Sequence, residues 1–295
     1  MRPARRFNGR LRGVMKIRFG YEIAYNSAAG VPMVVMLTAQ PSATQRIVRS
    51  DKLRIAPDLH PAYHLDGFGN TCARFVCRGG DLTLQADGLI EDSGSPEPAV
   101  LDALEVPLES LPNDALSYLL GSRYCETDLL GDKAWRLFGH VAPGWNRVQA
   151  ICDFVNQHVT FGYRYASSTK TAYQTYVERQ GVCRDMAHLA IALCRCINIP
   201  ARYCTSYLGD IGVQAVDAPM DFSACMEVYL GHAWHSFDPR NNARRIGRIM
   251  IARGRDAADV AFSTAFGHSQ LRSFRVWTEE VIEQRNIKLD STKAA

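Results

Sequence analysis

The sequence lacks the features that mark several common classes of protein. It has no uninterrupted apolar run near the roughly 18 to 20 residues that a membrane-spanning helix needs, no internal repeat, and no glycine-rich loop of the kind that cradles phosphate. Its cysteines include no CxxC pair of the kind that holds zinc. We therefore expect no membrane association, and neither a metal nor an organic cofactor.

The sequence also has no broadly distributed excess of positive charge. The formal net charge is +4, but five arginines and no acidic residue precede Met15, so that the rest of the chain carries about −1. A basic nucleic-acid-binding surface is therefore not expected. The arginine-rich segment has no apolar core of a secretory signal. We interpret residues 1–14 as a disordered tail or an upstream extension.

The nine cysteines form an odd set with irregular spacing. Free thiols in a reducing cytosol are the expectation for such a set without a secretory signal, and we predict a cytoplasmic protein. Eight of the cysteines are interpreted as small buried hydrophobes, since free cysteine is commonly buried. Cys183 is the exception.

The pattern along the chain predicts an α+β fold in two parts. Residues 15–95 read as strand after strand separated by turn-formers and predict an antiparallel β-sandwich; residues 96–113, rich in Ser, Pro and Glu, predict an exposed connector. Residues 114–290 begin with helical periodicity and continue as strands after Pro200, which indicates a helical part followed by an antiparallel sheet. The predicted helices are 115–120, 132–138, 147–158, 172–179 and 183–197, and the predicted strands after them are 201–208, 224–230 and 233–238.

Cys183 stands where a protein can make a thiol reactive. It follows Gly181-Val182 and opens the segment 183–197, whose apolar residues recur at intervals of three and four. Unpaired N–H groups and the positive end of the helix dipole favour a thiolate in the first turn of a helix, as does the adjacent Arg184. Gly181 permits a sharp turn and close approach of a substrate. For Asp185 we expect a capping or packing role.

The Gly-His pair at 231–232 predicts a two-residue hairpin turn, of type II′ because glycine stands first. In the corresponding register Cys225 lies opposite Asp238. Side-chain alternation then gathers Ser223, Cys225, Trp234 and Asp238 on a polar face, with Ser223 and Asp238 on a diagonal about 7–8 Å long. The other face is apolar.

These residues resemble the core of the transglutaminase-like superfamily, in the papain-related branch that includes bacterial predicted cysteine proteases. The resemblance covers roughly residues 123–242, and the β-rich part, with its Asp-Gly-Phe-Gly-Asn stretch at 66–70, resembles the domain that often precedes this core. The motifs that carry it are Arg-Gln-Gly-Val-Cys-Arg-Asp at 179–185, Asn-Ile-Pro-Ala-Arg-Tyr at 198–203, Asp-Phe-Ser-Ala-Cys at 221–225, and Trp234, Phe237, Asp238 and Pro239.

The resemblance implies a triad in which Cys183 is the nucleophile and Asp238 orients the base. The family's histidine falls at 223, in a motif that usually reads Asp-Phe-His-Ala-Trp, but this chain has Ser223 there and Cys225 in place of the tryptophan. Helix geometry aims His188 poorly at the thiol, and we expect it to be a buried, hydrogen-bonded histidine. By strand geometry His235 points to the opposite face, and His232 at the turn lies about 20 Å from Asp238. The sequence does not fix the positions of the other histidines, which are His60, His64, His140, His158 and His268.

The chemistry implied is thiol acyl transfer from a peptide-like amide or a thioester to water or an amine. Without a histidine nothing protonates a departing amine, help that is typically worth about 10²–10⁴-fold. Two alternatives remain: a catalytically impaired relative that binds a peptide or protein in the same cleft, and redox chemistry between Cys183 and Cys225. Ser223 positions a water or a carbonyl, or has no role; Trp234 walls the cleft or belongs to the core. The oligomeric state is left open.

Overall fold

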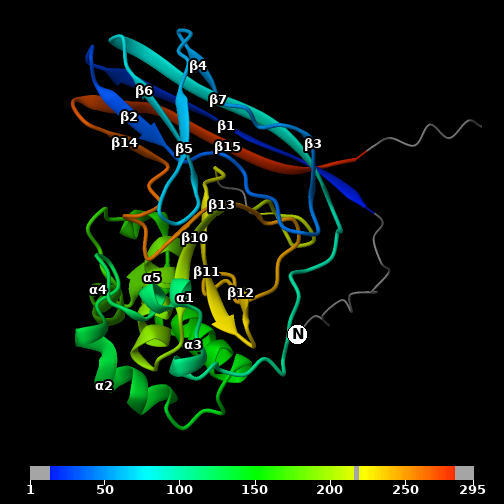
Figure 1. The fold of residues 1–295 in the computed structure, drawn as a ribbon, viewed down its shortest axis with the longest axis vertical. Coiled ribbons are helices and arrows are strands. Elements are labelled where there is room, and N and C mark those ends of the chain that lie inside the picture. The colour runs from blue at the N-terminus through cyan, green and yellow to red at the C-terminus, as the bar shows by residue number, and fades with distance from the viewer. Residues whose placement is uncertain (1–13, 216–218, 283–295) are drawn as a thin grey trace, which may run out of the picture.

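The computed structural model of the chain describes residues 14–215 and 219–282, so that the predicted extension at 1–14 lies, apart from Val14, outside the described residues. The fold is α+β with antiparallel sheets, as predicted. A strand-rich part lies above a mixed helical and sheet part, and the chain crosses between them more than once (Figure 1).

The strand-rich part consists of two antiparallel sheets. The predicted run of strands is present, and β1 alternates buried and partly exposed side chains so that Ile17, Phe19 and Tyr21 enter the hydrophobic core. One sheet has the order β15-β1-β7-β3 with β4 also on β7, and the other has the order β14-β2-β6-β5. The bounds are β1 Met15–Ser27, β2 Pro32–Val35, β3 Arg46–Arg49, β4 Arg54–Ala56, β5 Ala62–Leu65, β6 Thr71–Val76, β7 Gly80–Asp92, β14 Ser263–Ala265 and β15 Ser269–Val281.

The last two strands differ from the predicted division of the chain. The sequence analysis assigned residues 114–290 to one core, but β14 pairs with β2, and β15 pairs with β1 along nearly its whole length. Pairing between strands so far apart in the chain leaves no local signal in the sequence. The C-terminal strands therefore complete the sheets of the N-terminal part.

The helices follow a connector of extended chain and short 3₁₀ turns. The predicted helix at 115–120 is shorter than expected, because one α-helical turn after Pro112 gives way to a 3₁₀ turn; the other four are present. The bounds are α1 Asn113–Leu116, α2 Thr127–Phe138, α3 Trp145–His158, α4 Ala172–Glu178 and α5 Cys183–Cys196, with 3₁₀ turns η1 Leu108–Ser110, η2 Ser117–Leu119 and η3 Tyr163–Tyr165.

The core sheet has the order β12-β11-β10-β13, with bounds β10 Ala201–Tyr207, β11 Ser223–Leu230, β12 Ala233–Phe237 and β13 Ile249–Gly254. The predicted hairpin register is confirmed, since Met226 pairs with Phe237 and Leu230 with Ala233. The predicted turn type is wrong: φ is 54° at Gly231 and 64° at His232, and two positive values define type I′ rather than type II′.

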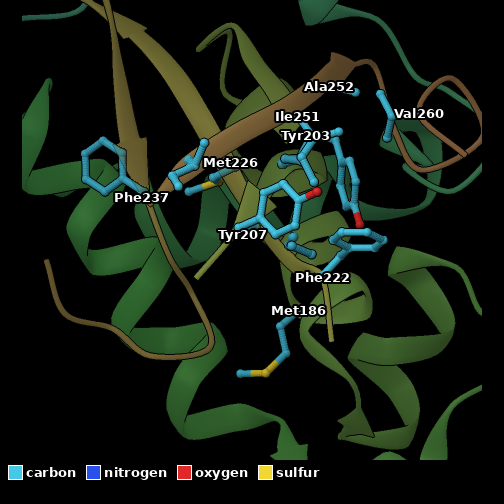
Figure 2. Close-up of a cluster of buried hydrophobic side chains, with 14 of the residues drawn as sticks. Met186, Tyr203, Tyr207, Phe222, Met226, Phe237, Ile251, Ala252 and Val260 are labelled. Carbon is cyan, nitrogen blue, oxygen red and sulfur yellow. The ribbon is translucent and has the colours of Figure 1, made fainter. Parts of the chain in front are cut away.

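Helix α5 packs on the apolar face of this sheet, against β10 and β11. Figure 2 shows Met186 of α5 below the core strands that carry Tyr203, Met226 and Ile251. Met186, Leu189 and Met226 are almost completely buried, and each such side chain contributes about 1.5–3 kcal/mol to stability. This packing fixes the first turn of α5 beside the start of β11.

The turn at 66–70 connects the two parts of the molecule. Asp66 accepts hydrogen bonds from the backbone N–H groups of Phe68 and Asn70 at 2.8 Å each. Asn70 in turn donates to the Arg253 carbonyl at 2.7 Å and accepts from the Arg253 N–H at 2.8 Å. The turn thus holds β13 of the core sheet against the N-terminal sheets.

Candidate active site

The structure places Cys183 at the first residue of α5, with its side chain half-buried. Asp185, which is fully buried, caps this turn by accepting a hydrogen bond from the Val182 N–H at 3.0 Å. A methyl group on Gly181 would come within 2.8 Å of the Asp185 side chain, so the glycine makes room for this cap. The strands β8 (Thr160–Phe161) and β9 (Gln180–Gly181) pair in parallel and hold in place the chain just before Cys183.

The surroundings of Cys183 keep its thiol protonated more than the sequence suggested. Burial raises the pKa of Cys183, and a hydrogen bond from the Ala224 N–H and the charge of Arg240 offset that effect only in part. Arg184, expected to favour the thiolate, instead binds Asp185 at 2.9 Å and the Ser167 carbonyl. The thiolate therefore depends on Arg240 and on the helix N-terminus.

Asp238 is buried just beyond the end of β12, and its carboxylate is already occupied. Arg248 donates to Oδ2 at 2.6 Å, and Asn241 donates through its side chain at 2.8 Å and its backbone N–H at 2.9 Å. Burial alone would raise the pKa of Asp238, but Arg248 and Asn241 outweigh it and the pKa lies below its usual range. The carboxylate is held by an arginine rather than left to orient a base.

Arg248 belongs to a buried ion network. Its guanidinium, with an exposed fraction of 2%, also binds Glu97 of the connector at 2.7 Å and the Ser206 hydroxyl at 3.2 Å. No local sequence pattern predicts this network, because Glu97, Ser206 and Arg248 come from three separate segments. Arg248 is therefore a site residue that the sequence analysis missed.

Ser223, at the family's histidine position, begins β11 and is buried. Its hydroxyl oxygen has no hydrogen-bond partner among the residues that the structure describes. It lines the same hollow as Cys183. The residue therefore bounds the same space as Cys183, but a neutral hydroxyl is no general base.

No histidine replaces the missing base. All eight histidines are in the described part of the chain, and none lines the two hollows beside Cys183. His188 is buried and hydrogen-bonded: it stacks on Tyr124, packs at a tilt against Tyr203, and its Nε2 accepts from the Ala257 N–H at 3.1 Å. His235 is held through Nε2 by the Leu230 carbonyl at 3.1 Å.

Arg240 is the second residue that the sequence analysis missed. It follows Asp238 by two positions, its guanidinium lies 4.0 Å from the centre of the Phe161 ring, and its charge acts on Cys183 and Asp221. Burial raises the pKa of Asp221, whose Oδ1 accepts the Phe222 N–H at 2.7 Å. A cation near the sulfur was not foreseeable, because the loop after β12 has no periodic pattern.

Two predicted supporting residues lie away from the cleft. Trp234 packs against Tyr118 and Tyr229, with the Arg202 guanidinium 4.0 Å from its ring centre, and lines neither hollow. It belongs to a small core at the hairpin end of the sheet, which is the second of the two roles expected for it. Cys225 is fully buried opposite Cys204 and is also absent from both hollows.

Two adjoining hollows meet at the site and share Tyr163, Asp221, Phe222 and Ser223. We call the larger one, of about 710 Å³, the apolar hollow; it contains Cys183 and is bounded by Tyr203, Ala224, Val260, Phe262 and Leu271. We call the other, of about 470 Å³, the polar hollow; it is bounded by Asp210, Asp221, Arg240 and Arg245. Within residues 14–215 and 219–282 no cluster of three or more histidine, cysteine or acidic side chains is arranged to hold a metal ion.

Residues 136–239 match the model of the transglutaminase-like superfamily, so the core of this chain is similar to the members of that superfamily. A predicted cysteine protease from Cytophaga hutchinsonii has a crystal structure that superposes with a TM-score of 0.78 at 28% identity, over 92% of this chain and 92% of that one. Uncharacterized proteins of Mycobacterium bovis and Mycobacterium tuberculosis are each 29% identical over 255 residues, which is 76% of this chain and 77% of theirs.

These likenesses support a thiol-based enzyme. No described helix is both long enough and apolar enough to cross a membrane.

Proposed function

We propose that this protein transfers acyl groups through Cys183 from substrates with good leaving groups, in particular peptide-like thioesters, rather than from unactivated amides. The observation that carries the proposal is that Ser223 stands at the triad's histidine position and that no histidine lines either hollow at the site. The charge of Arg240 lowers the pKa of Cys183 and offsets part of the effect of burial. A cation favours the thiolate but supplies no proton to a departing amine.

The reaction follows from these groups. Cys183 loses its proton to solvent, and its thiolate attacks the carbonyl carbon of R–CO–SR′, so that a new carbon–sulfur bond forms and R′S⁻ departs without needing a proton. Water or an amine then attacks the Cys183 thioester, and the acyl group leaves as an acid or an amide while the cysteine thiol is restored. The N–H groups at the start of α5, which have no partner within the helix, face the developing negative charge on oxygen.

The test is the covalent intermediate itself. The purified protein is incubated with an acyl thioester and, separately, with the p-nitroanilide of the same acid. The mass of the peptide that carries Cys183 is then measured by mass spectrometry to detect the added acyl group. We expect acylation and turnover with the thioester and at least 100-fold slower turnover of the anilide. Cys183→Ala should abolish both, whereas Cys196→Ala, a half-buried thiol at the other end of α5, should change neither. Equal rates on thioester and anilide would refute the proposal.

One observation favours a second candidate, a binding protein for peptides. Asp238 is neutralised by Arg248 and has no base to orient. If no acyl intermediate forms with any substrate and peptide binding is unchanged in Cys183→Ala, this second function is the correct one.

A cytosolic location is part of the proposal, supported by nine free cysteines.

A further inference from the structure

The apolar hollow differs in chemistry from the polar hollow beside it. Its walls are mainly aliphatic and aromatic, and only two charged residues, Arg184 and Asp221, stand among them. Both are engaged, Arg184 with Asp185 and Asp221 with the Phe222 N–H. The larger space next to the nucleophile is therefore one that favours an apolar group.

Three separate segments build this space. Tyr203 and Ala224 come from β10 and β11, Val260 and Phe262 from the loop between β13 and β14, and Leu271 from β15. Figure 2 shows Tyr203, Phe222 and Val260 grouped at the end of the core strands. The N-terminal sheets thus contribute a wall to a site whose nucleophile belongs to the core.

The loop between β13 and β14, which closes the hollow, is held in place by hydrogen bonds. Asp256, which is buried, accepts from the Tyr124 N–H at 2.8 Å and from the Ala258 N–H at 2.9 Å. The next residue, Ala257, donates its N–H to His188 of α5 at 3.1 Å. Because these bonds tie the loop to the helix that carries Cys183, the hollow is formed before a ligand arrives, and binding costs little ordering of the protein.

We propose that the apolar hollow binds an apolar chain or side chain on the acyl part of the substrate, while the leaving group lies toward the polar hollow. This inference rests on the proposed acyl transfer at Cys183 and adds the class of acyl group. A volume of about 710 Å³ is in the range of sites that enclose a medium-sized ligand. Such a chain would place its carbonyl carbon beside the sulfur when its tail fills the space between Tyr203 and Phe262.

A series of straight-chain thioesters from acetyl to octanoyl, all with the same leaving thiol, tests this. Burial of each added CH₂ group should raise kcat/KM about fourfold until the hollow is filled. Ala261→Phe, which places a ring in the hollow, should lower the ratio of octanoyl to acetyl kcat/KM at least tenfold. Ala258→Phe is the matched control, because it lies in the same loop but is exposed and does not line the hollow; its ratio should stay within twofold of that of the wild type.

A second measurement separates this inference from the proposed reaction. N-methyl, N-butyl and N-octyl chloroacetamides alkylate Cys183 without any acyl transfer, and the rate should rise with chain length in the wild type and lose that dependence in Ala261→Phe. Acylation of Cys183 with equal rates for all chain lengths would overturn the inference and leave the proposed function standing. Alkylation that depends on chain length, without any acylation, would refute the proposed acyl transfer and leave the apolar hollow as a binding site for apolar chains.

Discussion

Replacing Arg248 by methionine tests whether this arginine stabilises the buried Asp238 carboxylate in the folded protein. Arg248 and Asp238 are both nearly inaccessible, with exposed side-chain fractions of 2% and 1%, and their charged atoms are 2.6 Å apart. Methionine keeps most of the volume and removes the charge, so Asp238 and Glu97 lose their guanidinium partner together. Removing one member of a buried pair typically costs about 3–5 kcal/mol, because the remaining charge is left without compensation.

A surface pair of the same length provides the control. Arg46 and Glu91 are also 2.6 Å apart, but the Arg46 side chain is 72% exposed. Exposed pairs are worth about 0.2–1 kcal/mol. Urea unfolding followed by tryptophan fluorescence should therefore show a loss of about 3–5 kcal/mol for Arg248→Met and no more than about 1 kcal/mol for Arg46→Met. Equal losses would show that burial of the network does not matter.

The pH dependence of the Arg248→Met loss has a definite sign. In the wild type the pKa of Asp238 lies below its ordinary value, so its contribution to stability is present above the unfolded pKa of about 3.9 and is lost as the pH falls through the folded pKa. Without the guanidinium, the Asn241 hydrogen bonds still oppose the effect of burial, but the pKa of Asp238 is higher than in the wild type. Once this folded pKa exceeds the unfolded value, the variant becomes progressively less stable as the pH rises between the two.

The difference in free energy of unfolding between wild type and Arg248→Met should therefore be larger at pH 7.5 than at pH 5. It should grow by up to about 1.4 kcal/mol for each unit by which the pKa of Asp238 rises above 5. Adding Asp238→Asn to Arg248→Met should recover part of the loss at pH 7.5, since the amide carries no charge. A loss that is the same at both pH values, with no recovery in the double variant, would refute the assignment of the ion pair.

Two further predictions concern the nucleophile. Arg240→Gln should slow alkylation of Cys183 by iodoacetamide at pH 7 several-fold and move the pH midpoint of alkylation upward, because the guanidinium favours the thiolate. Arg244→Gln, at an exposed position of the same loop, is the control and should alter neither the rate nor the midpoint. An unchanged pH midpoint in Arg240→Gln would contradict this role. Ser223→His should raise the rate of p-nitroanilide hydrolysis by less than the roughly 10²–10⁴-fold typical of general acid–base catalysis, because the Asp238 carboxylate stays paired with Arg248. A gain within that range would show that Asp238 is free to orient the new histidine.

What the sequence predicted depended on local patterns. The start of α5 at Cys183 was predictable because the apolar period begins there, and the register of the β11–β12 hairpin because a two-residue turn fixes it. The turn type was not, since His232 adopts the left-handed conformation that asparagine or glycine more often supplies.

The rest of the site depends on contacts between distant segments. Strand alternation placed Ser223 and Asp238 near each other. It could not reveal that Arg248, from the segment before β13, donates a hydrogen bond to the Asp238 carboxylate. Nor could it show that Trp234, although on the predicted polar face, lies at the hairpin end of the sheet and not beside Cys183. The family pattern pointed to Cys183 as the candidate nucleophile, and only the packing showed which groups surround it.

The pairing of β15 with β1 has a consequence for how the protein is made. β1 lies between β7 and β15, so one edge of this long strand stays open on the ribosome until almost the whole described chain has been synthesised. Pairing across such a separation is slow to form, and an open strand edge is a template for intermolecular association. Because Leu271 of that late strand also bounds the apolar hollow, the hollow is completed only when the last strand joins the first.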